Sequence, residues 1–292
     1  KKRLSIKSEG LRLNMDYHKK FSIFRRNSGM LFLCIVLFVG YVLYKGITGS
    51  VFLNKKDRIN VVFYGQTTVF YSLGRDENIN YFFRIPSNVE IEIPGGYGYY
   101  RTGALGKLVS LERKKDILKK SFSAASSSFV DLYFYPRTNS IYYEEKKSQS
   151  LLPALGTIFM HNSNANLLDK TFIWFFFLQK SSNQYKELND IPQKKEHNRA
   201  LFDRERFFKD YQGFFYKKTY RNISDRVQIL YTKNYKTALL LSNILEGEGI
   251  QVVDISQISN IKDQRSKINK CLVIQNSKKT SVVAYDLQTF FG

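Results

Sequence analysis

Three glycines and two arginines are the residues of this chain whose types and spacing could serve chemistry. Gly95, Gly96 and Gly98 lie in one turn-rich loop, and Arg84 and Arg101 flank it. Backbone amides of glycine-rich loops cradle phosphates, and guanidinium groups bind them through paired hydrogen bonds. Our hypothesis is that both arginines point into one groove. The candidate ligand-binding residues are therefore Arg84, Arg101, Gly95, Gly96 and Tyr97.

The same glycines have a purely conformational explanation. Gly98 and Gly103 have the spacing of a phosphate loop, but Ala104 follows where that motif needs Lys, and no GxGxxG is present. Glycine also serves where φ is positive or where chains cross tightly. Sequence favours this second explanation and leaves ligand contact open.

No other set of residues indicates catalysis or metal binding. The chain lacks GxSxG, HExxH and zinc-type cysteine spacing. Cys34 lies within an apolar run and Cys271 near the other end, so they cannot pair within one chain, and His18, His161 and His197 are isolated. We predict no catalytic residue, no metal and no cofactor.

The clearest structural element in the sequence is the apolar run at residues 30–44. A helix over 29–47 would span about 28 Å, which matches the hydrocarbon core of a bilayer. Residues 1–29 carry nine Lys and Arg against Glu9 and Asp16, an excess that keeps this end in the cytoplasm. The alternatives are a buried core helix and a cleavable signal peptide ending near Ser50.

The remainder of the chain is basic, with 36 Lys and Arg against 23 acidic residues outside the leader and the span. Such a surface attracts anionic lipid headgroups or phosphate-containing wall polymers, although codon bias in an AT-rich genome explains the composition equally well. Nucleic acid would be the default partner of a cytosolic chain this basic. Because the anchor places the chain outside, we expect none.

Alternating and helical periodicities predict an α/β (α+β) protein. Strands are expected at 59–64, 68–73, 79–85, 89–93 and 129–135, with a helix from 102 to about 121. The apolar stretch 172–178 is too short to span a bilayer, which leaves a core element or an interfacial membrane contact. A short amphipathic helix is expected at 203–216. A last β-α-β-β-α unit has strands at 227–231, 250–255 and 271–275 and helices at 237–248 and 282–291, with Gly249 closing the first.

These elements predict six segments. They are a cytoplasmic leader 1–28, a transmembrane helix 29–47, a stalk 48–58, an α/β domain 59–180, a linker with a short helix 181–222 and a C-terminal domain 223–292.

The stretch Ile85-Pro86-Ser87-Asn88-Val89-Glu90-Ile91-Glu92-Ile93-Pro94-Gly95-Gly96-Tyr97-Gly98 resembles the LytR-CpsA-Psr (LCP) family of bacterial envelope proteins. The strand 227–230, the helix 238–245 and Gly249-Ile250-Gln251-Val252-Val253 resemble the LytR C-terminal domain of that family. The resemblance covers about residues 20–135 and 220–292. It implies an N-in protein with one membrane helix that transfers a glycopolymer from polyprenyl pyrophosphate to peptidoglycan, with Mg²⁺ bridging the pyrophosphate.

The chain departs from the family where the chemistry is implied. Gln66-Thr67 or Thr67-Thr68 stands in place of Asp-Thr, and Ser87-Asn88 stands in place of Arg-Asp. Arg199, Asp203, Arg204 and Arg206 are possible stand-ins for a later Arg/Asp-rich motif, at different spacing. We therefore predict a membrane-anchored, extracytoplasmic pseudoenzyme that binds or scaffolds an anionic wall polymer or a polyprenyl-phosphate lipid. The alternatives are an active LCP-type phosphotransferase using substituted residues, and a nucleic-acid-binding protein.

Overall fold

The structure is a computed structural model. It describes residues 9–54, 57–77, 79–138, 140–143, 152–189, 191–258, 272–276 and 278–291. The chain forms two compact units, Lys1–Gly49 and Ser50–Gly292, and each is described by itself.

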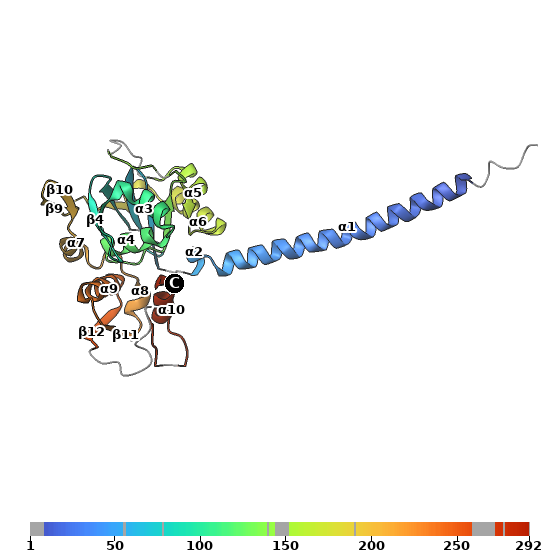
Figure 1. Cartoon of the computed structure of the whole chain (residues 1–292). Coiled ribbons are helices and arrows are strands. Elements are labelled where there is room, and N and C mark those ends of the chain that lie inside the picture. The colour runs from blue at the N-terminus through green and yellow to red at the C-terminus, as the bar shows by residue number, and fades with distance from the viewer. Residues whose placement is uncertain are drawn as a thin grey trace, which may run out of the picture. The chain divides into compact units, whose positions relative to one another are not determined.

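The first unit contains one long helix, α1 (Glu9–Thr48) (Figure 1). Its segment Gly29–Thr48 is 20 residues long, none of it is buried, and by length and composition it can cross a membrane. The described helix therefore includes the predicted span 29–47 and is a candidate membrane anchor. Its orientation in a membrane stays a prediction.

The second unit is built on a six-stranded mixed sheet in the order β7-β6-β1-β2-β3-β8. Its strands are β1 (Arg58–Phe63), β2 (Thr67–Gly74), β3 (Asn80–Pro86), β6 (Leu132–Tyr135), β7 (Asn162–Ser163) and β8 (Tyr185–Glu187). Strands β1, β2 and β3 form an antiparallel meander, and β6 and β8 join it in parallel. Aromatic and β-branched side chains dominate the central strands, as pleated, buried surfaces favour.

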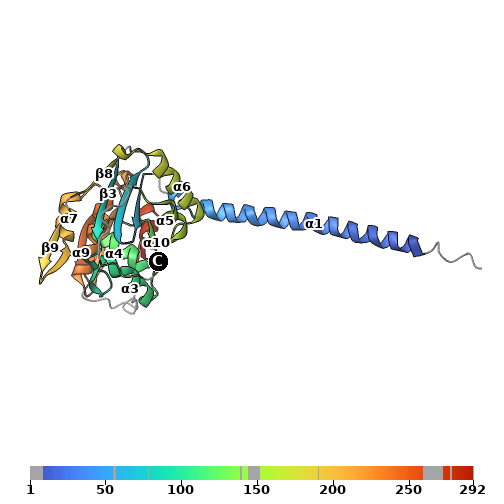
Figure 2. The same cartoon turned by 90° about the horizontal axis from the view of Figure 1, so that it is seen from above.

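Helices cover both faces of this sheet, and each face has its own core cluster. The helices of the first cluster are α3 (Leu105–Glu112), α4 (Asp116–Ser126) and α7 (Arg204–Tyr211). Those of the second are α2 (Val51–Asn54), α5 (Leu155–Met160) and α6 (Leu167–Gln179). Figure 2 shows α5 and α6 on one side of the sheet and α7 on the other. The α/β fold class is thus confirmed.

A second sheet packs with the first cluster, in the order β5-β4-β10-β9. Its strands are β4 (Glu90–Ile93), β5 (Gly98–Arg101), β9 (Gln193–Glu196) and β10 (Arg199–Phe202). Together with β8 and the 3₁₀ turn η2 (Ser182–Gln184), strands β9 and β10 occupy much of the segment 181–222 that was predicted as a linker. That interpretation is wrong for residues 182–202, because pairing with distant strands orders a segment whose own sequence is polar.

The C-terminal part contains α8 (Lys218–Arg221), β11 (Arg226–Tyr231), α9 (Tyr235–Glu248), β12 (Gln251–Gln257) and α10 (Val282–Phe291). Strands β11 and β12 pair in parallel. Gly249 ends α9 in the left-handed conformation, as predicted. The expected third strand is wrong for residues 272–275, which are irregular, and Cys271 lies outside the described residues.

Two further predictions need correction. The single helix expected after the 3₁₀ turn η1 (Thr102–Ala104) is two helices, because Arg113 adopts φ 54° and ends α3. The expected stalk 48–58 contains α2, whose Phe52 is buried against Phe172 and Phe176.

Candidate functional site

The two positions at which the resemblance implies charged motifs lie together at one end of the central sheet. Thr67 pairs with Pro86, and Thr68 pairs with Ile85, across β2 and β3. The strand register therefore brings Gln66-Thr67-Thr68 next to Ser87-Asn88. The hydroxyls of Thr68 and Ser87 are buried and lack a hydrogen-bond partner among the described residues.

Tyrosines and backbone fill the space beside this strand end. The Tyr64 hydroxyl donates to the carbonyl of Gly103 (3.1 Å) and accepts from the amide of Gly106 (2.8 Å). Burial raises the pKa of Tyr64 to about 12. The amide of Tyr142 donates to the Gly103 carbonyl (3.0 Å), and a Cβ on Gly103 would overlap the Tyr142 backbone. The strand end is therefore a packed junction with uncharged side chains.

The glycine loop between β4 and β5 is explained by its conformation. Gly95, Gly96 and Gly98 have φ values of 97°, 88° and 75°, which side-chain-bearing residues rarely adopt. Tyr97 packs partly against the first core cluster, and its hydroxyl donates to Glu112 (2.9 Å). The prediction that these glycines supply positive φ is confirmed. Their contact with a ligand stays a prediction.

The structure does not place Arg84 and Arg101 in one groove. Arg84 lies opposite Val69 in the sheet register, on the face of the second core cluster, where it pairs with Glu187 and lies over the ring of Phe82. Arg101 belongs to the second sheet, which packs with the first cluster. Alternation along β3 puts Arg84 on the face of the second core cluster, whereas Arg101 lies on β5 of the other sheet, so the hypothesis of a shared groove is wrong. Contact of either arginine with a ligand stays a prediction.

Two carboxylates on β4 instead collect cations from distant parts of the chain. Glu90 pairs with Arg199 and lies 3.9 Å from Arg101. Glu92 pairs with Arg204 (3.2 Å) and Lys236 (2.7 Å). Glu90 and Glu92 point away from the buried Ile91 and Ile93 because residues two apart share a strand face. Arg199 and Arg204, possible stand-ins for the family's later motif, are thus both held by internal carboxylates.

A cavity of about 260 Å³ adjoins Glu92. Its apolar part comes from the second sheet and α4, and its charged part from Glu92, α7, β9 and the start of α9. The lining residues are Ile91, Glu92, Tyr99, Ala124, Ala125, Lys194, Glu196, Leu201, Phe202, Asp203, Arg204, Glu205 and Lys236. We call this cavity the β4 cleft. Its volume is just below the range of about 300–1,000 Å³ typical of small-molecule sites.

The charges of the β4 cleft compensate one another. Its three cations are Lys194, Arg204 and Lys236, and each has a carboxylate partner, with Asp203 lying 3.0 Å from Lys194. The hydrogen bonds that the Lys194 and Lys236 ammonium groups donate to Asp203 and Glu92 raise the pKa of both lysines. Asp203 also caps α7 by accepting from the amide of Arg206, whose side chain lies 3.5 Å from Asp210.

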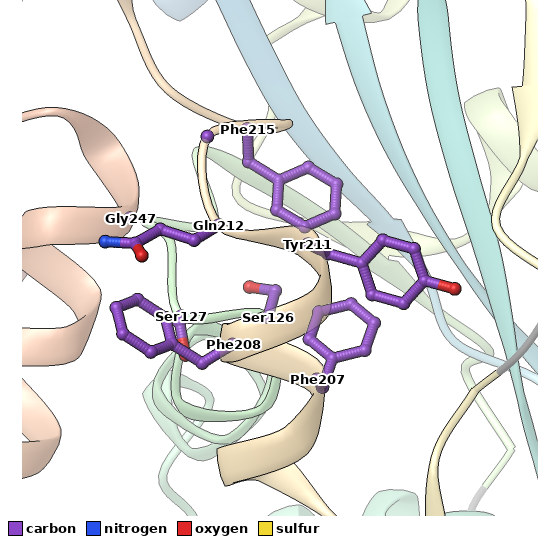
Figure 3. Close-up of a pocket in the computed structure, with 9 residues that line it drawn as sticks. Ser126, Ser127, Phe207, Phe208, Tyr211, Gln212, Phe215 and Gly247 are labelled. Carbon is purple, nitrogen blue, oxygen red and sulfur yellow. The ribbon is translucent and has the colours of Figure 1, made fainter.

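A second hollow lies between α7 and the end of α4 (Figure 3). Phe207, Tyr211 and Phe215 gather on one side of it, while Phe208 and Gln212 extend toward Gly247. The space between these described residues does not admit a water molecule. It is a packing seam between α7, α4 and α9.

The described part of the chain contains no group of three His, Cys, Asp or Glu side chains placed to hold a metal ion. The resemblance implies Mg²⁺ at the strand end, but the motif positions there offer threonine and serine hydroxyls and the amides of Gln66 and Asn88, with no carboxylate. Mg²⁺ is normally bound through one or two carboxylates. The residues present do not fit Mg²⁺, and we derive no step through it.

Sequence reasoning singled out the arginines around β4, but not their grouping, nor the carboxylates of Glu90 and Glu92 or the lysines Lys194 and Lys236. The alternation of Glu90 and Glu92 with apolar residues was a usable signal for one charged face. Lys236 gave no signal, because its partner Glu92 lies more than one hundred residues away in sequence. Lys194 gave none because its partner Asp203 comes close only through the β9–β10 hairpin.

The fold and site define an α/β protein that carries a candidate membrane anchor and a charge-compensated cleft. No protein-family model and no curated protein matches the chain. The chain is similar over part of its length to several solved structures. TagT from B. subtilis is 12% identical with a TM-score of 0.36, and the match covers 53% of this chain and 88% of TagT.

Two further solved structures give similar values. The LytR-CPS2A-psr family protein YwtF (TagT), with bound octaprenyl pyrophosphate lipid, is 13% identical with a TM-score of 0.36, and the match covers 54% of this chain and 90% of that chain. TagV from B. subtilis is 9% identical with a TM-score of 0.37, covering 55% and 98%.

Proposed function

We propose that this chain is a membrane-anchored, extracytoplasmic protein of the bacterial envelope that binds or scaffolds a wall polymer or lipid-linked precursor without catalysing its transfer. The observation that supports the absence of catalysis is the ion pairing of cations with the two carboxylates on β4. Arg101, Arg199, Arg204 and Lys236 all lie within ion-pair distance of Glu90 or Glu92.

Charge compensation of this kind opposes a pyrophosphate clamp. A clamp needs cations whose field is not already cancelled, aimed at the place where charge develops. A phosphate oxygen about 4 Å from the Glu92 carboxylate would be repelled by about 4 kcal/mol at an effective dielectric constant near 20. The strand end offers no cation in exchange, since its motif positions are uncharged.

Weak, salt-sensitive binding of an anionic polymer is compatible with the same arrangement. Lys194 and Lys236 are more than half exposed on long side chains, so they can turn toward a passing phosphate. The excess of basic residues outside the span adds long-range attraction. This supports a surface that retains polymer near the membrane and releases it readily.

Retention of the detergent-solubilised full chain on immobilised teichoic-acid-type polymer tests binding. We expect retention at low salt, elution as salt rises, and weaker retention for Lys236→Gln. Lys233→Gln is the matched control, because Lys233 is exposed nearby and outside the cleft lining. Equal retention of the two variants would remove the cleft from the proposal, and no salt-sensitive retention would contradict polymer binding.

A transfer assay with polyprenyl-pyrophosphate-linked glycopolymer, peptidoglycan and Mg²⁺ tests silence. We expect no product, and no rise in the melting temperature of the full chain when the lipid and Mg²⁺ are added together. Turnover above that of a protein-free control would restore the phosphotransferase alternative.

A further inference from the structure

Helix α6 carries an apolar stripe that the rest of the described unit leaves uncovered. Leu167, Phe175 and Leu178 are 72%, 46% and 61% exposed, and their spacing of eight and three residues places them on one helical face. The opposite face, with Ile173, Phe176 and Phe177, is buried in the second core cluster. We call Leu167, Phe175 and Leu178 the α6 stripe.

Neighbouring groups give the α6 stripe an interfacial character. Trp174, the only tryptophan of the chain, lies at its edge with its ring 4.9 Å from that of Phe175. Lys170 and Lys180 lie near the two ends of the stripe. Aromatic rings and lysines beside an apolar surface are typical of segments at the headgroup level of a bilayer.

Hydrogen bonds tie the first turn of α6 to the residues that follow the candidate span in sequence. The Ser50 hydroxyl (2.6 Å) and the Phe52 amide (2.9 Å) both donate to the buried Asp169 carboxylate in the first turn of α6. Only Gly49 separates Ser50 from Thr48, where the span ends. Two residues of chain reach about 7 Å at most.

We propose that the α6 stripe seats on the membrane surface, with Leu167, Phe175 and Leu178 entering the boundary between headgroups and acyl chains. This inference rests on the proposed anchorage by Gly29–Thr48. The occupant is the bilayer because the first turn of α6 binds Ser50, which follows the candidate span by two residues. Helix α6 is 13 residues, or about 20 Å, long, so the whole stripe lies within reach of that surface.

Trp174 supplies a test in the full chain, since α1 contains no tryptophan. The protein is reconstituted into phosphatidylcholine–phosphatidylglycerol vesicles with or without bromine on the acyl chains, and fluorescence is compared. We expect brominated lipid to lower Trp174 emission by about half. Leu167→Ser/Leu178→Ser should lose most of this quenching, whereas Leu111→Ser/Leu230→Ser, a pair of exposed leucines on other elements, should keep it.

Flotation of the same vesicles separates the two proposals. A chain that floats after an alkaline wash but shows no quenching would overturn the membrane seat and leave the anchorage standing. A chain that fails to float would overturn the anchorage and the seat together. Quenching that persists in Leu167→Ser/Leu178→Ser would also overturn the seat, because contact would not depend on the stripe.

Discussion

At the scale of single residues, the densest polar cluster surrounds Lys217. Its ammonium lies 3.1 Å from Asp131 and 3.3 Å from Glu248, and all three side chains are buried. Burial by itself lowers the pKa of Lys217, but the charges of Asp131 and Glu248 outweigh it and raise the pKa. The Lys217 side chain therefore stays charged, and its ion pairs join the loop before β6 to the end of α9.

Lys217→Met should lower the free energy of unfolding by about 3–5 kcal/mol, because it leaves two carboxylates buried without their cation. Urea denaturation followed by Trp174 fluorescence measures this. Lys218→Met is the neighbouring control: Lys218 pairs with Glu77 at the surface, and its loss should cost about 1 kcal/mol or less. Equal losses would show that the buried cluster contributes no more than an exposed pair.

His161 gives the protein a pH dependence of known sign. Burial, and then the charge of Lys170, lower the pKa of His161 in the folded chain. The unfolded chain takes up this proton near pH 6.5, before the folded chain does, so stability falls as pH drops below about 6.5. His161→Gln should flatten that part of a plot of melting temperature against pH between 5 and 8. An unchanged slope would place the effect on other groups.

At the scale of elements, the close approach of α9 to the end of α4 depends on one glycine. A Cβ on Gly247 would overlap the carbonyl of Ser127, so the two segments would have to separate. Gly247→Ala should cost about 1–3 kcal/mol of unfolding free energy. Gly156→Ala in α5 is the control: its nearest atom is 3.9 Å from the new Cβ, and alanine favours helix by about 1 kcal/mol. If Gly247→Ala left the free energy of unfolding unchanged, α9 and the end of α4 would not be tightly packed against each other.

Elements with a strong local period were predictable, and those ordered by distant partners were not. The strands β1, β2 and β3, helix α10 and the end of α9 at Gly249 follow their own sequence patterns. The hairpin β9–β10 does not, because β9 is a fully exposed, polar strand that gains order from pairing with β10 beside β4. Helix α3 ends at Arg113, which adopts a left-handed conformation although it is not a glycine.

The candidate site likewise has one part that local sequence predicts and one part that depends on distant residues. The glycine conformations were predictable because the constraint is local. The grouping of Arg101 and Arg199 around Glu90, and of Arg204 and Lys236 around Glu92, was not, because it joins five elements. The separation of Arg84 and Arg101 depends on the placement of β3 and β5 in different sheets, which a list of separate strands does not supply.

At the scale of the whole molecule, the C-terminal elements share a core with the α/β body. Ala124 of α4 and Phe129 belong to the same cluster as Leu245 and Phe290, and the rings of Phe129 and Phe290 lie 4.8 Å apart. Asn60 on β1 also donates to Glu248 on α9. Apolar packing and the Lys217 ion cluster thus meet at one seam, which places the β4 cleft and α9 in one compact unit.

Because these elements form one unit, residues from distant parts of the chain together set the electrostatic field around β4. Replacing one carboxylate on β4 tests this. Glu92→Gln removes the internal counter-ion of Arg204 and Lys236, which come from separate parts of the chain. We expect retention on anionic polymer to rise about threefold to tenfold at low salt, a gain of about 0.7–1.4 kcal/mol. The gain should vanish near 1 M salt, where screening acts within about 3 Å.

Glu112→Gln separates local release from net charge. It adds the same charge to the molecule, but Glu112 is exposed on α3 and lies outside the cleft. Retention of Glu112→Gln therefore measures the global field, and the excess for Glu92→Gln measures the two released cations. If the variants bind polymer equally, Glu92 does not hold these cations back, and polymer binding must rest on the diffuse basic surface instead of the β4 cleft.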